Sequence, residues 1–221
     1  MITFTKPDAY YKGIHPKIFE MITPGTQKVL DLGCGTGELG KRLKAEKGVE
    51  QVVGIETMPE VAREAKENLD RVIRIDVENV RLDGLAKHFD CIVMSGILHH
   101  LKDPWAVVRR FREYLKDDGY VLAAIPNVGH ISVIKDLLLG KWNYKTEGIL
   151  DVCHMKFFTL EEMSRMFVNA GYKPVAVEEE VADFTPENAD FIKRLKASVP
   201  VGPNFERDSF VLQFITKWAK A

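Results

Sequence analysis

The stretch Val29–Gly40, VLDLGCGTGELG, constrains the fold of this 221-residue chain strongly. It begins as an apolar run typical of a buried strand and ends in a segment with helical spacing. Gly33, Gly35 and Gly37 stand at alternate positions between the two, and glycine weakens both strands and helices. A tight turn needs one or two glycines, so this spacing indicates backbone that approaches a ligand closely. A glycine loop between a strand and a helix is typical of nucleotide-type cofactor sites.

Short apolar runs alternate with helical segments through the first two thirds of the chain. After a first strand at 28–33, the sequence predicts strands at 52–56, 71–77, 89–96 and 120–127, with helices at 37–48, 59–69 and 103–119. Parallel strands need crossover connections, so this alternation predicts a parallel sheet.

The last third predicts a capped helix at 159–171 and then two strands, at 172–181 and 208–219, with a short helix around 187–197 between them. These two strands lack a long helical crossover, so we expect them to pair antiparallel. The fold class is therefore α/β, with a doubly wound, mostly parallel seven-stranded sheet and an antiparallel last strand. The length favours a single domain over 1–221.

The composition excludes several classes of partner. Lys and Arg number 31 and Asp and Glu 32, a net charge of −1 that gives no basic surface for nucleic acid. No apolar stretch approaches the length of a membrane span, and the N-terminus lacks the apolar segment of a signal peptide. Cys34, Cys91 and Cys153 form no C-x-x-C pair, so we expect buried, reduced thiols and no metal site. These features predict a cytoplasmic protein.

The glycine spacing discriminates between cofactors. The dinucleotide fingerprint G-x-G-x-x-G fails when it starts at Gly33, because Glu38 occupies the last position. The fingerprint matches Gly35, Gly37 and Gly40, but this match starts two residues further from the end of the strand than the fingerprint requires. Glu38 would also put negative charge at the helix N-terminus, where a pyrophosphate binds. A cofactor without phosphate fits this loop better, and NAD stays the alternative.

VLDLGCGTG is similar to the first motif of class I S-adenosylmethionine-dependent methyltransferases, and later residues follow in that family's order. The resemblance implies that Glu56, at the end of the second strand, binds the ribose hydroxyls and that Asp31 orients the methionine amino group. It places the adenine beside Asp76 and Val77, at the end of the third strand. SGILHHLKDP resembles the motif after the fourth strand. The remaining implied cofactor-binding residues are Gly33, Gly35, Gly37 and Ser95.

A second, shorter resemblance lies in the segment 128–158, which shows no clear strand. GILDVCHMKFFT looks like an element of methyltransferases found alongside glycan-building enzymes, and the segment occupies the place where the family builds its substrate cap. The resemblance implies a small cap inserted after strand 5, with Asp151, His154 and Lys156 as candidate polar groups. Phe157 and Phe158 can equally be core residues. The expected acceptor is a small-molecule or glycan-type compound.

Methyl transfer from a sulfonium is an in-line displacement, so the protein positions the acceptor and, for a hydroxyl, removes its proton. A neutral imidazole suits this role near neutral pH. His99 and His100 follow the fourth strand, and His154 could reach the same place from the cap, so these three are the candidate catalytic residues. The absence of N-P-P-[YFW] after the fourth strand argues against methylation of flat amino groups. An NAD-dependent oxidoreductase and a non-catalytic cofactor-binding module are the alternatives.

Overall fold

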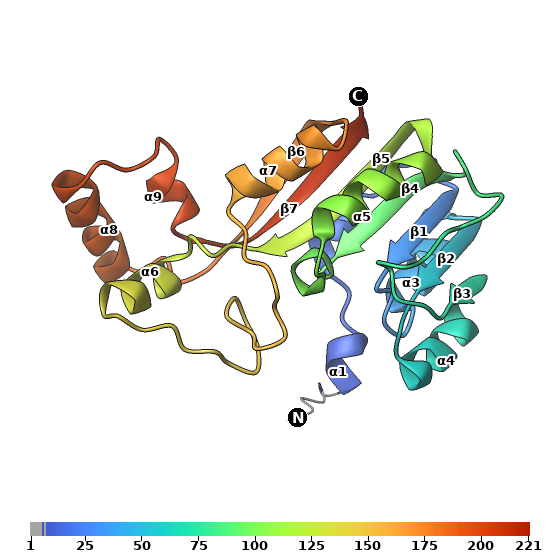
Figure 1. Ribbon diagram of the computed structural model, residues 1–221, viewed down its shortest axis with the longest axis horizontal. Coiled ribbons are helices and arrows are strands. Elements are labelled where there is room, and N and C mark those ends of the chain that lie inside the picture. Colours follow the sequence, from blue (N-terminus) through green and yellow to red (C-terminus); the bar gives the residue numbers. More distant parts are fainter. Residues whose placement is uncertain (1–5, 7) are drawn as a thin grey trace.

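A seven-stranded sheet runs through the centre of the molecule (Figure 1). The computed structural model describes residue 6 and residues 8–221. The strands stand in the order β3-β2-β1-β4-β5-β7-β6. Their bounds are β1 (Lys28–Leu32), β2 (Gln51–Ile55), β3 (Arg71–Ile73), β4 (Phe89–Ser95), β5 (Leu115–Pro126), β6 (Tyr172–Val181) and β7 (Val211–Lys220).

The strand pairing confirms the predicted fold class. β1 pairs parallel with β2 on one side and with β4 on the other, and the pairs β2–β3 and β4–β5 are also parallel. β7 runs antiparallel between β5 and β6. The strand order reverses at β1, and doubly wound sheets bind ligands at the carboxyl ends of the strands beside such a reversal.

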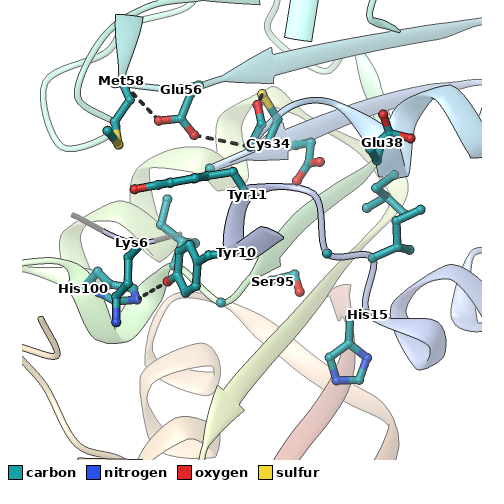
Figure 2. Close-up of a pocket in the computed structure, with 18 of the residues that line it drawn as sticks. Lys6, Tyr10, Tyr11, His15, Cys34, Glu38, Glu56, Met58, Ser95 and His100 are labelled. Atoms are coloured by element: carbon teal, nitrogen blue, oxygen red, sulfur yellow. Dashed lines mark hydrogen bonds between the residues drawn. The ribbon is translucent and has the colours of Figure 1, made fainter. Parts of the chain in front are cut away.

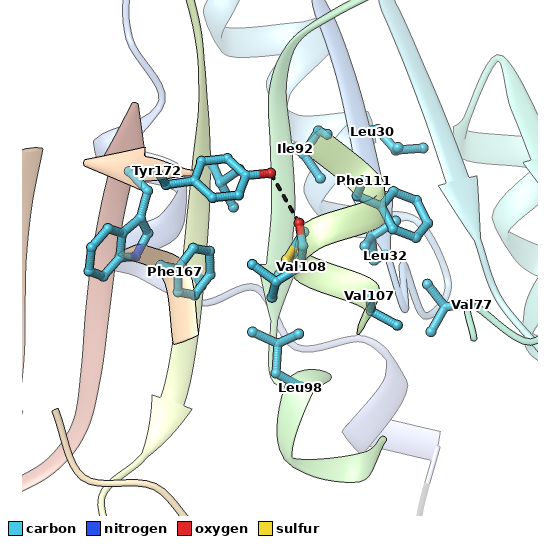
Figure 3. Packing of buried hydrophobic residues seen from close by; sticks show 14 of the residues in the cluster. Leu30, Leu32, Val77, Ile92, Leu98, Val107, Val108, Phe111, Phe167 and Tyr172 are labelled. Carbon is cyan, nitrogen blue, oxygen red and sulfur yellow. Dashed lines mark hydrogen bonds between the residues drawn. The ribbon is translucent and has the colours of Figure 1, made fainter. Parts of the chain in front are cut away.

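Helices cover both faces of the sheet, as the alternating sequence pattern predicts. α2 (Pro16–Met21), α3 (Glu38–Lys47) and α4 (Pro59–Asn68) share one apolar cluster, while α5 (Pro104–Phe111) and α7 (Leu160–Asn169) share another. Successive residues of β4 alternate between the two clusters, because side chains alternate across a strand. Figure 3 shows Val107, Val108 and Phe111 of α5 packed toward Leu30, Leu32 and Ile92 of the sheet.

Three helices lie apart from the sheet. α6 (Ile131–Leu138), α8 (Pro186–Ser198) and α9 (Phe205–Asp208) gather beyond the ends of β5 and β7 around a small cluster of Ile131, Ile192 and Phe210 (Figure 1). α6 opens the segment 128–158, which continues as a long loop and returns to the sheet where Asn127 and Phe158 form an isolated bridge. The short elements are α1 (Asp8–Tyr11) and the 3₁₀ turns Leu98–His100 and Arg112–Tyr114. None of the helices in the described residues is long and apolar enough to cross a membrane.

Several predicted elements have different bounds in the structure, and the fifth strand begins at Leu115 and not at residue 120. The third strand ends at Ile73 and not at Val77, because its partner β2 ends at Ile55, which is paired with Ile73. The helix predicted over 103–119 ends at Phe111, since the backbone carbonyls of residues 113 and 114 accept hydrogen bonds from the N–H groups of residues 87 and 88 and lead into β5. The last strand begins at Val211, because the residues before it form α9.

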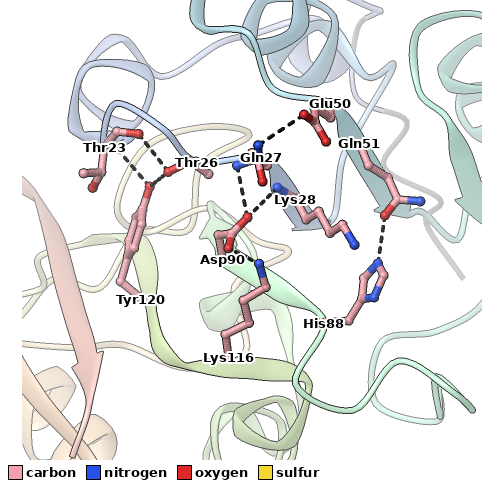
Figure 4. A network of polar contacts seen from close by, with 10 residues as sticks. All are labelled: Thr23, Thr26, Gln27, Lys28, Glu50, Gln51, His88, Asp90, Lys116 and Tyr120. Carbon is pink, nitrogen blue, oxygen red and sulfur yellow. Dashed lines mark hydrogen bonds and ion pairs between the residues drawn. The ribbon is translucent and has the colours of Figure 1, made fainter.

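Asp90 joins the amino ends of three strands, at the edge of the sheet opposite the carboxyl ends (Figure 4). Its Oδ2 accepts hydrogen bonds from the backbone N–H groups of Gln27 at 3.0 Å and Lys28 at 2.7 Å, and its carboxylate pairs with Lys116. Partial burial favours the neutral acid, but these donors outweigh it and lower the pKa of Asp90. The carboxylate therefore holds β1, β4 and β5 together at their starts.

Asp90→Asn should lower the free energy of unfolding by about 1–3 kcal/mol, the scale of a hydrogen bond to a charged group. The amide keeps one acceptor oxygen but loses the charge that Lys116 faces. Urea denaturation at pH 7 measures the change, with the exposed Asp118→Asn in β5 as the control. Equal stability of the two variants would contradict the assignment.

Candidate functional site

A cavity of about 460 Å³ lies at the carboxyl ends of β1, β2 and β4 (Figure 2). The structure brings together here most of the residues that the sequence proposes for cofactor binding. Asp31, Gly33, Gly35, Glu56 and Ser95 all line this cavity. His100 lines it as well, so a candidate catalytic residue stands beside the candidate cofactor residues.

The glycine loop has a backbone conformation that glycine adopts with least strain. Gly35 has φ +54° and Gly37, which precedes α3 and does not line the cavity, has φ +81°. A Cβ atom on Gly35 would lie 2.4 Å from the backbone oxygen of Tyr11. The N–H and Oγ1 of Thr36 donate hydrogen bonds to the same oxygen, at 3.0 and 3.1 Å. The close approach that the glycines predict is therefore in part an approach of the chain's own N-terminal segment.

Glu56 holds the loops around the cavity together. Its carboxylate accepts hydrogen bonds from the backbone N–H groups of Gly35 at 3.2 Å, Thr57 at 2.8 Å and Met58 at 2.9 Å (Figure 2). The Thr57 hydroxyl adds a longer bond of 3.4 Å to Oε1, whereas Oε2 accepts only the Gly35 N–H, so Oε2 can still accept a further donor. The buried Glu56 therefore faces the cavity with acceptor capacity left.

Asp31 is buried and has no side-chain hydrogen bond to any of the described residues, although it lines the cavity. Burial and, to a smaller extent, the neighbouring Glu56 carboxylate raise the pKa of Asp31 to about 7. A buried acid with a raised pKa in a cavity is typical of a functional site. Its chemistry suits a cationic group of a ligand.

The N-terminal segment forms a wall of the cavity that the sequence analysis did not predict. Lys6, Tyr10 and Tyr11 line the cavity (Figure 2), and Lys6 Nζ is bonded to the carboxylate of Asp151 in the cap segment. The adjacent aromatic residues 10 and 11 before a glycine are the signal that could have drawn attention to this segment. Cys153 also lines the cavity and is half-buried, which corrects the expectation of a fully buried thiol.

A second cavity, of about 260 Å³, adjoins the first. Tyr10 and Gly96 line both cavities, so the two meet at these residues. The smaller cavity is bounded mainly by the cap segment and the ends of β5, β6 and β7. Its other polar lining residues are His99, Glu147, Asp151, His154, Glu180 and Gln213.

His99, His100 and His154, which we call the histidine cluster, lie at this junction. Their ring centroids are 4.3 Å apart for His99 and His154, 4.5 Å for His99 and His100, and 4.8 Å for His100 and His154. The backbone oxygen of His99 accepts hydrogen bonds from the N–H groups of Met155 at 2.8 Å and Lys156 at 3.1 Å. The cap segment is thus fixed directly against the 3₁₀ turn after β4, which is why histidines distant in the sequence come together.

Backbone carbonyls set the protonation of two of these rings. His100 Nδ1 lies 3.2 Å from the oxygen of Cys153, and His154 Nδ1 lies 2.9 Å from the oxygen of Ile149. A carbonyl oxygen can only accept, so in both rings Nδ1 carries the proton and Nε2 has the lone pair. His100 Nε2 accepts from the Tyr10 hydroxyl at 3.2 Å (Figure 2).

Burial lowers the pKa of each histidine in the cluster. The effect is largest for His99, whose pKa lies well below its ordinary value because it is deeply buried and because the two neighbouring rings add repulsion. Burial and the neighbouring His154 lower the pKa of His100, and burial lowers that of His154. The cluster is therefore uncharged at neutral pH.

Besides Gly37, three residues proposed from the sequence lie outside both cavities. Asp76 is exposed, beyond the end of β3, and its carboxylate accepts a hydrogen bond from the N–H of Glu78 at 2.8 Å. Val77 is buried in the core, and Lys156 lies 5.9 Å from the centre of the Trp105 ring. The adenine contact of Asp76 and Val77 stays a prediction.

Residues 9–177 match a family model described as "Methyltransferase domain". The chain belongs to this methyltransferase family. S-adenosylmethionine is its cofactor, and the class that the glycine motif resembles is confirmed.

Two curated relatives carry names of O-methyltransferases. The chain is 30% identical over 156 residues to "Ubiquinone biosynthesis O-methyltransferase" of Neisseria meningitidis, which covers 66% of this chain and 63% of the relative. It is 27% identical over 176 residues to "Malonyl-[acyl-carrier protein] O-methyltransferase" of Geobacter sulfurreducens, which covers 76% of this chain and 64% of the relative. The match therefore spans less than two thirds of the length of either relative.

Solved structures of methyltransferases share the fold. The crystal structure of a SAM-dependent methyltransferase from Archaeoglobus fulgidus superimposes with a TM-score of 0.64 at 18% identity, over 93% of this chain and 90% of that one. An S-adenosylmethionine-dependent methyltransferase from Mesorhizobium loti gives a TM-score of 0.63 at 19% identity, over 92% of this chain and 95% of that one. At this level of identity the likeness shows the fold.

Gly35→Val should weaken S-adenosylmethionine binding by at least about tenfold, or 1.4 kcal/mol, because its Cβ would displace the Tyr11 carbonyl from the loop. Gly48→Val is the matched control, since Gly48 also has a positive φ, of +66°, but no atom within 4 Å of an added Cβ. Calorimetric titration of both folded variants measures the difference. Wild-type affinity in a folded Gly35→Val protein would show that this loop is not part of the cofactor site.

Asp31 should make the ligand-free protein less stable as the pH rises. Its pKa in the folded protein, about 7, lies above its ordinary value of 3.8, so the folded state binds the extra proton between those pH values and loses that advantage as the pH rises through the window. Two pKa units correspond to about 3 kcal/mol between pH 5 and pH 8. Urea denaturation at the two pH values should show this loss in the wild type and not in Asp31→Asn. Identical pH dependence in both proteins would contradict the raised pKa.

Proposed function

We propose that this chain transfers the methyl group of S-adenosylmethionine to a hydroxyl oxygen of a small-molecule or glycan-type acceptor. The observation that carries the proposal is the junction of the two cavities at Tyr10 and Gly96, with the histidine cluster beside it. In-line displacement needs the donor and the acceptor on opposite sides of the methyl group. A cofactor in the larger cavity and an acceptor in the smaller one satisfy that requirement.

The larger cavity supplies groups that match the cofactor's chemistry. The Glu56 carboxylate has acceptor capacity for the ribose hydroxyls, which are donors. The Asp31 carboxyl has no other partner in the described chain and can bind the methionine ammonium, which would favour its ionised form. Ser95 and the glycine loop complete the proposed contacts, together with the predicted adenine contact of Asp76 and Val77.

Among the three histidines, His154 is the best placed to take the acceptor's proton. Its Nδ1 donates to the Ile149 oxygen, and its Nε2 has no partner among the described residues. In contrast, His100 Nε2 already accepts from Tyr10, so His100 is better suited to position the junction than to remove a proton. His99 is 4% exposed and supports the turn that carries the cluster.

The lining of the smaller cavity supports a hydroxyl-bearing acceptor. Glu147, Asp151 and Glu180 contribute carboxylates, which accept hydrogen bonds from hydroxyl groups. The names of the relatives from Neisseria and Geobacter both specify transfer to oxygen, which supports an oxygen acceptor here.

The comparisons give no support to the alternative of an NAD-dependent oxidoreductase. A non-catalytic S-adenosylmethionine-binding module would not need a second cavity at the histidine cluster. Formation of S-adenosylhomocysteine in a screen of sugars, nucleotide sugars, quinols and small phenols separates this module from an enzyme. Failure of every acceptor class to raise that product above the rate without acceptor would contradict the proposed function.

His154→Asn should lower kcat on the acceptor found by that screen by roughly 10²-fold, the usual scale for loss of a general base. Asparagine can still donate a hydrogen bond to the Ile149 oxygen, so the cap keeps its contact while the basic Nε2 is lost. Cofactor affinity should stay within a few-fold. Product formation at saturating cofactor, with the acceptor varied, gives kcat and KM separately.

His88→Asn is the control, because His88 is bonded to Gln51 at the amino end of the sheet. It should keep the wild-type kcat. If His154→Asn also keeps it, positioning alone accounts for the catalysis and the proton leaves to water.

A further inference from the structure

The histidine cluster offers a binding capability that methyl transfer does not require. We propose that His99, His100 and His154 form a site for a divalent transition-metal ion of the Zn²⁺ type. One ligand atom from each ring lies within 4.8 Å of the other two, and the rings come from the 3₁₀ turn after β4 and from the cap segment. Three imidazoles with an open fourth position are an established way of holding Zn²⁺ in proteins.

The hydrogen bonds of the cluster prepare two rings for an ion. Imidazoles that bind a metal through Nε2 characteristically donate their Nδ1–H to a carbonyl or a carboxylate, which fixes both tautomer and orientation. His100 and His154 both make this bond, to the carbonyls of Cys153 and Ile149. The Nε2 atoms of these two rings, which carry the lone pairs, are therefore the expected ligand atoms.

The burial of His99 supports a metal site independently of the spacing of the three rings. It is 4% exposed, and its Nδ1 is buried without a hydrogen-bond partner in the described chain. A buried polar atom without a partner is costly and uncommon in native proteins. The ring centroid of His99 lies 4.3 Å from that of His154 and 4.5 Å from that of His100. An ion bound by all three rings would therefore give the unpartnered nitrogen of His99 a partner.

The rings must move closer to hold an ion. Two nitrogens about 2.1 Å from a tetrahedral Zn²⁺ are roughly 3.4 Å apart, whereas the ligand atoms here spread to 4.8 Å. His100 and His154 are half-buried, and a tilt of these rings about their Nδ1–H bonds would bring the two Nε2 atoms closer, whereas His99 is enclosed. The Tyr10 hydroxyl donates to His100 Nε2 at 3.2 Å, and this hydrogen bond would have to break before the Nε2 lone pair could bind the ion.

The donor set selects the kind of ion. Neutral imidazole nitrogens favour Zn²⁺, Co²⁺, Ni²⁺ or Cu²⁺, whereas Mg²⁺ and Ca²⁺ prefer oxygen ligands. The nearby Lys6 and Asp151 form an ion pair, so their charges offset one another beside the cluster. The sequence predicted no metal site, because the ligands come from two distant segments with no C-x-x-C or H-x₃-H spacing.

An ion at this site competes with the proposed base. Binding would occupy the Nε2 lone pair of His154, so Zn²⁺ should slow methyl transfer and a chelator should restore it. That consequence rests on the proposed function, whereas metal binding itself does not. The two can fail separately, because binding is measured without turnover.

Co²⁺ titration of the full chain tests the site, since nitrogen-bound Co²⁺ gives visible absorption bands. We expect one Co²⁺ per chain, displaced by Zn²⁺, and a Kd at least about tenfold weaker in His154→Asn and in His100→Asn, a loss no smaller than that usual for outer-shell changes at metal sites. His88→Asn should bind Co²⁺ like the wild type, because His88 lies at the other end of the sheet. Circular dichroism verifies that each variant is folded.

Unchanged Co²⁺ binding in either folded cluster variant would overturn the proposal, as would the absence of binding by the wild type at millimolar Co²⁺ and Zn²⁺. Equal weakening by His88→Asn would also overturn it, because the ion would then be bound elsewhere. If His154→Asn does not fold, His100→Asn decides the outcome, since it replaces a different ligand outside the cap segment.

Discussion

The parallel pairing of β1 with β2 on one side and β4 on the other determines where this protein can bind a ligand. All three strands end at the same edge of the sheet, so the loops that follow them meet there. The glycine loop and Glu56 come directly after β1 and β2, and the 3₁₀ turn with His99 and His100 follows β4 after two intervening residues. Asp90 joins β1 and β4 to β5 at the opposite edge, where its carboxylate contributes stability without competing with the site.

Backbone contacts then attach two further segments of the chain to this edge. The Tyr11 oxygen accepts two hydrogen bonds from Thr36, which ties the N-terminal segment to the glycine loop. The His99 oxygen accepts two from the cap segment, at Met155 and Lys156. Both segments are therefore attached to the junction of the cavities by main-chain groups, to which the Tyr10–His100 and Lys6–Asp151 contacts add.

The sequence predicted the sheet and several of the residues that line the larger cavity, because the strand and glycine patterns are local and the glycine motif resembles that of a known family. Strand alternation and the glycine spacing placed the glycine loop at one edge, and the family resemblance implied Asp31 and Glu56 beside it. The sequence could not reveal the early end of β3, which depends on where its partner β2 stops. Nor could it reveal the Tyr10–His100 contact or the unsatisfied Nδ1 of His99, since these arise from packing between distant segments.

The central claim is that cofactor and acceptor occupy two cavities that meet at Tyr10 and Gly96. A crystal structure of the full chain with S-adenosylhomocysteine tests it most directly. The claim predicts the ribose hydroxyls on the Glu56 carboxylate and the sulfur at the Gly96 boundary, directed into the smaller cavity. A sulfur directed away from that cavity, or a ribose bound elsewhere with Glu56 still bonded only to backbone N–H groups, would contradict it.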